Sequence, residues 1–181
     1  MYHPLNSIPG GKRLPAFLWL LAATIGITIV FRFIGPFKPT IVDFELAGSV
    51  AKSSAIIGAW DTLARLQTCF NLGFDYLYMP VYSTTIALAC VMSAGVVARS
   101  GWKNLGLLLA WGLWLAAILD AVENYALITM MYGSPVDPYP QIAAYCAACK
   151  FGLILLGLLY ALISLIVYLV KLSRGKLVPL K

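Results

Sequence analysis

Four long apolar stretches with very few charges constrain the fold of this chain most strongly. They run roughly over residues 15–35, 72–98, 104–132 and 141–170. A helix needs about 20 predominantly apolar residues to cross the roughly 30 Å hydrocarbon core of a bilayer, and each stretch meets that length. The composition agrees, since 61% of the residues are hydrophobic and only 11% are charged. The sequence therefore predicts an all-α polytopic membrane protein, a bundle of four transmembrane helices.

The remaining segments leave no room for a second domain. The longest of them, residues 36–71, is too short for an independent core in water. Lys12 and Arg13 precede the first span, as in a secretory signal, but the apolar run is long and no small-residue cleavage pattern follows it. We therefore expect a single integral membrane domain over residues 1–181, in which the first span is retained.

The distribution of charges predicts the orientation. Basic residues without acidic neighbours precede the first span, separate the second from the third, and follow the fourth. These residues are Lys12, Arg13, Arg99, Lys103, Lys171, Arg174, Lys176 and Lys181. The acidic residues fall in the other loops or within the spans. The positive-inside rule then places both termini in the cytoplasm.

The net charge of +6 does not indicate a nucleic-acid-binding protein. Basic tails beside a span attract anionic lipid headgroups, by about 1 kcal/mol for each Lys or Arg near the surface. The expected partners are therefore membrane lipids, and we predict no nucleic-acid partner.

The segment over residues 36–71 is predicted to lie outside the cytoplasm and to contain a short helix. Ser49 is a suitable N-cap, and apolar or small residues follow it at near-helical spacing. These are Val50, Ala51, Ser54, Ile57 and Trp60. One interpretation is an interfacial helix anchored at headgroup level by Phe44 and Trp60. The other is a lid over the outer mouth of the bundle.

Polar residues inside the third and fourth spans are the strongest functional signal. Asp120, Glu123 and Asn124 are spaced i, i+3 and i+4, so they share one helical face. Charges at membrane depth cost about 2.5 to 3.5 kcal/mol on insertion scales, so they normally face the bundle interior and have partners. Lys150, the only charge in the fourth span, lies at a compatible depth. We therefore predict an Asp120–Lys150 ion pair, and Asp120, Glu123 and Lys150 are the candidate catalytic residues.

A second polar group precedes these residues in the chain. Asp75 is expected at the outer start of the second span, with Tyr78 and Tyr82 along the same helical face. With Asn124 and with Glu45 of the outer segment, they form the candidate ligand-binding set. A polar path descending from the outer surface would result. The alternative is a satisfied network that only fixes helix register.

Cys146 and Cys149 form a C-x-x-C pair at the outer start of the fourth span. This layout resembles the vitamin K epoxide reductase family, which implies four spans, cytoplasmic termini and thiol–disulfide exchange. That family has a second cysteine pair, whereas here Cys69 stands alone in the outer segment and Cys90 lies in the second span. A thiol pair in an Ala-rich helix also fits simple packing. Zinc is disfavoured because the lone His3 is predicted to be cytoplasmic.

Two further resemblances concern short motifs. Phe44-Glu45-Leu46-Ala47, Asp75 and Leu119-Asp120-Ala121-Val122-Glu123-Asn124 together resemble an uncharacterised family of small bacterial four-span membrane proteins. That resemblance implies a bacterial cytoplasmic membrane and conveys no activity. The Asp120-x-x-x-Asn124 spacing is similar to part of the VanZ-like proteins, which implies lipid-linked envelope chemistry. Their other motif residues do not occur in this chain.

The sequence leaves several functions open and identifies no cofactor or metal. The preferred interpretation is an accessory or ligand-binding membrane protein, in a larger membrane complex or a homo-oligomer. An enzyme acting on a lipid or lipid-linked headgroup at the outer leaflet is an alternative. Asp120 or Glu123 would then be the general base or a ligand of a hard cation, and Lys150 and Asn124 would bind phosphate or carbonyl oxygens. Proton or ion translocation is a third class, and thiol–disulfide exchange a fourth.

Overall fold

The computed structural model describes residues 2–34, 38–97 and 99–174. Some residues used in the predictions, at the ends of the first two spans and in the basic tail, lie outside these ranges. They are Gly35, Pro36, Ala98, Lys176 and Lys181.

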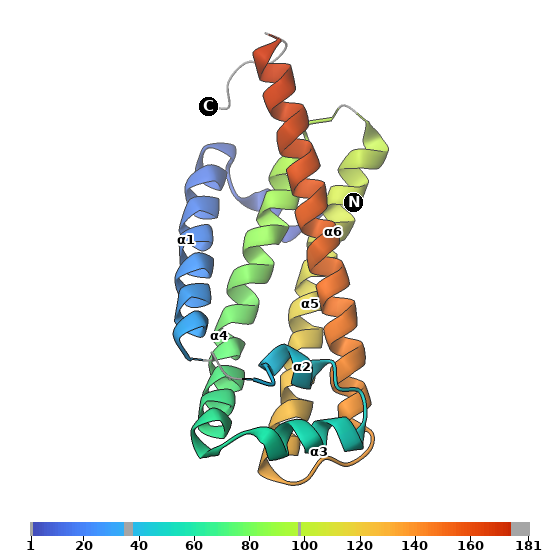
Figure 1. Ribbon diagram of the computed structural model, residues 1–181. Helices are drawn as coiled ribbons and strands as arrows, with labels where there is room; N and C mark the ends of the chain where they lie inside the picture. The colour runs from blue at the N-terminus through green and yellow to red at the C-terminus, as the bar shows by residue number, and fades with distance from the viewer. Residues whose placement is uncertain (1, 35–37, 98, 175–181) are drawn as a thin grey trace.

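Four long helices form the body of the protein, which confirms the all-α four-span prediction (Figure 1). They are α1 (Gly10–Ile34), α4 (Thr62–Ser93), α5 (Ser100–Tyr132) and α6 (Tyr139–Ser173). Each is long and apolar enough to cross a membrane. A short 3₁₀ helix, η1 (Pro4–Ser7), precedes α1. The chain is therefore an integral membrane protein by the length and composition of its helices.

The helix α4 begins at Thr62, ten residues before the predicted start of the second span at Leu72. The side chain of Asp61 caps it, accepting a hydrogen bond from the backbone N–H of Ala64 at 2.8 Å. Such a cap satisfies a backbone donor that the helix itself leaves without a partner. The helix is longer than the predicted span because the prediction used apolarity alone, whereas a capped helix continues through polar residues beyond the hydrocarbon.

The helices pack unequally. α5 packs extensively against both α4 and α6, whereas α1 packs mainly against α4. Two hydroxyl pairs join α1 to α4: Thr24 to Thr85 and Thr28 to Tyr78, each with oxygens 2.9 Å apart. None of the most apolar part of α1 is buried inside the protein. This helix is therefore held at one side of a three-helix core.

The end of the bundle opposite the outer segment has its own apolar core. It contains Ala87, Cys90, Leu107, Ala110, Leu113 and Tyr160. Tyr160 lies against Gly106, where any larger side chain would overlap the phenol ring. Its hydroxyl donates to the carbonyl of Trp102 at 3.0 Å. Gly106 therefore allows α6 to approach α5 closely.

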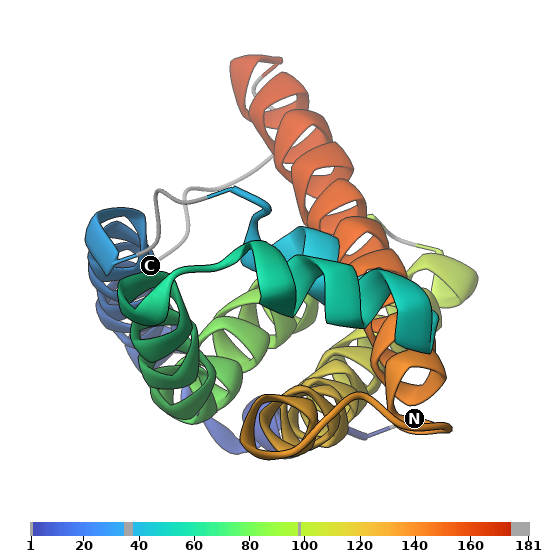
Figure 2. The same ribbon diagram turned by 60° about the horizontal axis from the view of Figure 1, so that its bottom comes forward.

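Two short helices cross the other end of the bundle (Figures 1 and 2). They are α2 (Ile41–Glu45) and α3 (Val50–Ala59). The predicted helix after Ser49 is confirmed, and the Ser49 hydroxyl accepts from the N–H of Lys52 at 3.4 Å. The turn between α2 and α3 contains Gly48 at φ +67, a left-handed conformation that glycine adopts without strain.

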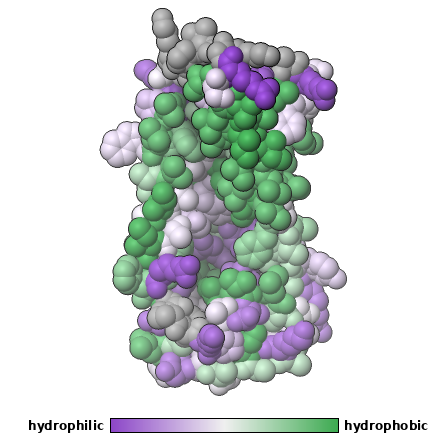
Figure 3. All heavy atoms as spheres, turned by 45° about the horizontal axis from the view of Figure 1, so that its top comes forward, coloured by the Kyte–Doolittle hydropathy of each residue, from purple (hydrophilic) through white to green (hydrophobic). Residues whose placement is uncertain are grey.

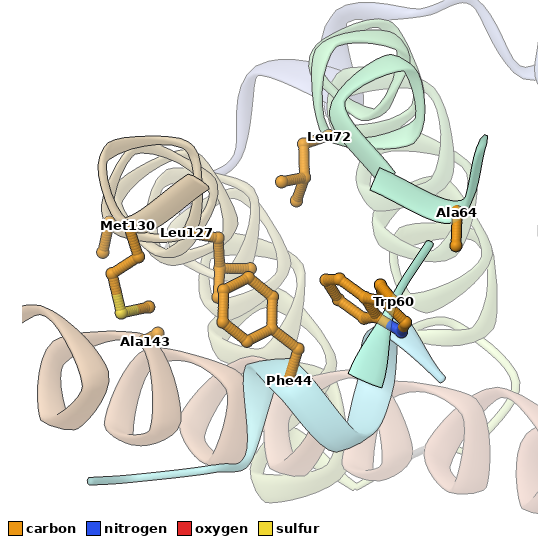
Figure 4. Packing of buried hydrophobic residues seen from close by; sticks show 8 residues of the cluster. Phe44, Trp60, Ala64, Leu72, Leu127, Met130 and Ala143 are labelled. Atoms are coloured by element: carbon orange, nitrogen blue, oxygen red, sulfur yellow. The ribbon is translucent and has the colours of Figure 1, made fainter. Parts of the chain in front are cut away.

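Aromatic residues fix these two helices to the bundle (Figure 4). Phe44 is 1% exposed and Trp60 is 3% exposed, and their rings meet edge to face at 5.3 Å. They pack in one cluster with Leu72, Leu127, Met130 and Ala143 of the long helices. The two rings therefore pack inside the protein and do not anchor the segment by contact with lipid headgroups. Edge-to-face pairing and burial instead hold α2 and α3 over the end of the bundle.

We predict that Phe44→Ala destabilises the protein by about 3 to 5 kcal/mol, because it removes a buried ring and leaves a cavity. Loss of the ring should also release α2 and increase proteolysis between α1 and α4. Thermal unfolding and limited proteolysis in a detergent micelle would measure both effects. Leu46→Ala is the matched control, since Leu46 is 48% exposed. Equal effects of the two substitutions would contradict this account of how α2 is held.

Candidate functional site

A buried charge cluster is centred on Lys150 of α6, which is 5% exposed. Its ammonium donates to Asp120 Oδ1 at 2.6 Å and to Glu123 Oε1 at 2.9 Å, both from α5. Glu45 Oε2 lies 3.9 Å from the same nitrogen. The predicted ion pair between Asp120 and Lys150 is therefore present. Lys150 joins three carboxyl groups from two other helices.

The helices bring these residues to one level. Lys150 lies about 11 residues after the start of α6 at Tyr139. Asp120 lies about 12 residues before the end of α5 at Tyr132. Both residues are therefore roughly 17 Å along their helices from the loop that joins α5 to α6. α5 and α6 are consecutive and antiparallel, so equal distances from their shared loop place the two side chains together. The i, i+3 spacing then brings Glu123 to the same face.

Hydrogen bonds extend the cluster to α4. The Tyr82 hydroxyl donates to Asp120 Oδ2 at 2.9 Å. Asn124 Nδ2 donates to Asp75 Oδ2 at 2.9 Å and to the carbonyl of Leu72 at 3.2 Å. Asp75 was expected at the outer start of the second span; since α4 starts at Thr62, Asp75 lies about 13 residues or ~20 Å along this helix. Asp75 therefore lies at the depth of the cluster.

Glu45 reaches the cluster because α2 turns inward at the end of the bundle. Glu45 is only 8% exposed. Burial raises the pKa of Glu45 to about 7, and the Asp120 carboxylate also raises it, while the charge of Lys150 lowers it. The direction follows from the cost of removing a carboxylate from water. Glu45 is thus a residue of the site, although it lies in the segment between spans.

A cavity of about 1170 Å³ opens beside the cluster. It runs between α1, α4 and α6, and Figure 3 shows the hollow, with polar atoms deep between hydrophobic walls. Its polar end is lined by Glu45, Asn71, Asp75, Tyr78, Tyr82, Asp120, Asn124 and Lys150. The remainder is mostly apolar, lined by Phe17, Leu21, Ile154, Leu158, Leu162 and Leu165 among others. Glu123 is fully buried and is not part of the cavity wall.

The structure therefore brings together most of the candidate residues and adds others. Asp75, Tyr78 and Tyr82 all line the cavity, as does Asn124. Asn71 was missed, although it precedes Asp75 by one helical turn and shares its face. The contribution of α1 was also missed, because the apolar residues of that helix do not indicate which face lies inward.

The two cysteines of the C-x-x-C pair are separate from this site. Cys146 is half-buried and Cys149 is exposed, and both are free thiols. Neither lines the cavity. Among the described residues, no group of three His, Cys, Asp or Glu side chains is arranged to hold a metal ion.

Comparison with known proteins gives no match: no family model fits the sequence, and no curated protein or solved structure is significantly similar to it. The resemblances drawn from short motifs therefore stay predictions.

We predict that Lys150→Met destabilises the fold by about 3 to 5 kcal/mol, because the substitution leaves buried carboxyl groups without their cation. Lys52→Met is the control, since Lys52 is exposed on α3. Thermal unfolding in detergent would measure the difference. Adding Asp120→Asn and Glu123→Gln to Lys150→Met should restore much of the stability. A Lys150→Met protein as stable as the control would show that the ion pairs contribute nothing to folding.

A second prediction concerns pH and Glu45. Because the pKa of Glu45 rises from 4.5 to about 7 on folding, the folded state favours its protonated form. The contribution of Glu45 to stability is therefore full below about pH 4.5 and is lost as the pH rises through 7, by about 1.4 kcal/mol for each pH unit. The groups facing it are Lys150 of α6 and Asp120 and Glu123 of α5.

The matched variant for this prediction is Glu45→Gln, which keeps the shape of the side chain and cannot ionise. Melting temperatures of wild type and variant would be compared at pH 5.5 and pH 8. The variant should gain stability relative to wild type at the higher pH. Parallel curves for the two proteins would refute the assignment.

Proposed function

We propose that this protein binds a membrane amphiphile, with the polar headgroup at the Lys150 cluster and the apolar chain along the cavity. The observation that carries the proposal is the cavity itself, which joins a polar end and an apolar trough in one continuous space. At about 1170 Å³, it exceeds the range of roughly 300–1,000 Å³ typical of small-molecule pockets. A ligand with a polar headgroup and a long apolar chain suits both the volume of the cavity and its separation into a polar end and an apolar trough.

The length of the trough supports a long apolar chain. It extends along α6 from Lys150 to Tyr168, which is about 18 residues or roughly 27 Å. One leaflet contributes only about half of the roughly 30 Å hydrocarbon core. The trough therefore accommodates a chain longer than one leaflet is deep.

The arrangement of α1 supports entry from the side. α1 packs against α4, and no extensive contact joins it to α6 among the described residues. The cavity lies between these two helices, so an amphiphile would enter laterally from the bilayer. The hydroxyl pairs Thr24–Thr85 and Thr28–Tyr78 hold α1 on the opposite side of that opening.

The charge distribution supports placing the headgroup in the outer leaflet. With both termini in the cytoplasm, α2 and α3 lie on the outer side. α5 has 33 residues, about 50 Å of helix, so a centred hydrocarbon layer of roughly 30 Å leaves about 10 Å at each end. The cluster would then lie about 7 Å below the outer hydrocarbon boundary, covered by α2. The bacterial cytoplasmic membrane is the location that fits the motif resemblance.

An enzyme acting on the headgroup of such a lipid is the second candidate. The observation that favours it is Glu45, whose Oε2 is buried, lacks a hydrogen-bond partner and belongs to a residue lining the cavity. A carboxylate of that kind serves as a general base when a substrate proton comes within reach. The ligand recovered from the protein separates the two candidates, because an enzyme yields a chemically altered headgroup and a binder returns the amphiphile unchanged.

We predict that protein purified in mild detergent retains one class of amphiphile, measured by mass spectrometry of its organic extract. Ala161→Trp should reduce the retained amount about tenfold or more, because a Trp in the trough overpacks it by about 1 to 3 kcal/mol. Ala161 lines the cavity.

The matched control is Ala148→Trp on the exposed face of the same helix, which should leave the retained amount unchanged. Equal lipid content in the two variants and the wild type would overturn the proposal. Melting temperatures of both variants would show that each remains folded.

A further inference from the structure

The polar end of the cavity has more hydrogen-bond acceptors than donors. Three oxygen atoms there are buried and without a hydrogen-bond partner: Glu45 Oε2, Asn71 Oδ1 and Asn124 Oδ1. Their residues are 8%, 5% and 1% exposed and all line the cavity. Buried polar atoms are normally paired. These oxygens therefore call for a ligand that donates hydrogen bonds.

Most donors at this end are already engaged. Lys150 donates to Asp120 and Glu123, and Tyr82 donates to the other oxygen of Asp120. Both hydrogen bonds from the Asn124 amide nitrogen go to Asp75 and the carbonyl of Leu72. Tyr78 shares its hydroxyl with Thr28. A headgroup rich in acceptors, such as a phosphate, would find few free donors, namely one N–H of Lys150 and the amide of Asn71.

The balance of charge favours the same kind of ligand. The carboxyl groups of Glu45, Asp75, Asp120 and Glu123 lie around the single ammonium of Lys150, whose charge one carboxylate already balances. An anionic headgroup would meet net repulsion at close range, whereas a cation would relieve it.

Aromatic rings complete the surroundings. Phe31, Tyr78 and Tyr82 line the same cavity as Asp75. The ring centroids of Phe31 and Tyr78 are 5.4 Å apart, and those of Tyr78 and Tyr82 are 5.0 Å apart. Faces of aromatic rings attract cations within about 6 Å. Carboxylates, free amide oxygens and rings together form a cation-binding environment.

We propose that the headgroup held at this end of the cavity carries an ammonium group with N–H donors, so that the ligand is an amino-amphiphile. Such a group offers up to three donors to the oxygens of Glu45, Asn71 and Asn124, with Asp75 nearby as a counter-ion. This inference rests on the proposed binding of an amphiphile in the cavity and specifies its headgroup.

The test compares four probes with the same chain: hexadecylamine, hexadecyltrimethylammonium, hexadecanol and hexadecyl phosphate. Competition between them for the protein in detergent micelles would be followed by native mass spectrometry. Hexadecylamine should bind about tenfold or more tightly than hexadecanol and hexadecyl phosphate. The trimethylammonium probe should bind less well than the amine, because it is a cation without N–H donors.

Two variants assign the preference to this site. Asp75→Asn and Glu45→Gln should each reduce the preference for amine over alcohol, measured as the ratio of the two affinities in each variant, by about threefold or more. Asp137→Asn is the matched control, because Asp137 lies in the loop before α6 and does not line the cavity. A preference that survives both variants would overturn the inference, as would stronger binding of the phosphate probe.

The outcomes also separate this inference from the proposed function. If all four probes bind equally and Ala161→Trp blocks them all, the cavity binds amphiphiles and the ammonium assignment is wrong. If no probe binds in a manner sensitive to Ala161→Trp, both proposals are wrong.

Discussion

The need to satisfy one buried ammonium organises much of this structure. Lys150 lies at membrane depth, where an unpaired charge is costly, and its three carboxyl partners come from α5 and α2. The ion pairs of Lys150 with Asp120 and Glu123 fix the register between α5 and α6, the two helices that pack most extensively. The more distant Glu45 adds a reason for α2 to turn inward instead of lying flat at the surface. Apolar packing of Phe44 and Trp60 then holds that short helix where the electrostatics favours it.

The cavity follows from an imbalance in how the helices pack. α4, α5 and α6 form a close core, helped by Gly106 beneath Tyr160. α1 contributes no buried residue to it. Because α1 is held to α4 by two hydroxyl pairs and by ring contacts between Phe31 and Tyr78, the space toward α6 is not closed by side chains. A bundle that packed all four helices equally would have no trough.

Much of the fold and of the site could be predicted from the sequence. There are physical reasons why the other parts could not be predicted. The long apolar stretches predicted the spans. The i, i+3 spacing of Asp120 and Glu123, and the similar depths of Asp120 and Lys150 along their helices, predicted the ion pair between Asp120 and Lys150. The helix α2 has only five residues, too few for a periodic signal, so the position of Glu45 beside Lys150 could not be derived. Phe44 and Trp60 were ambiguous, because aromatic rings suit both a membrane interface and a buried cluster. The trough depends on which face α1 presents, and an almost uniformly apolar helix does not encode that.

A purely structural network and a binding site make different demands on the same residues. A network that only fixes register is stable when every buried donor and acceptor is paired, since a partly satisfied one is worse than apolar packing. Here Lys150 donates to Asp120 and Glu123, but Glu45, Asn71, Glu123 and Asn124 each leave an oxygen without a hydrogen-bond partner. Three of these four acceptors, all but that of Glu123, belong to residues that line the open space. The ion pairs with Lys150 therefore explain how the helices are held, whereas register alone does not explain acceptors left without donors beside an open cavity, which is what the proposed ligand would satisfy.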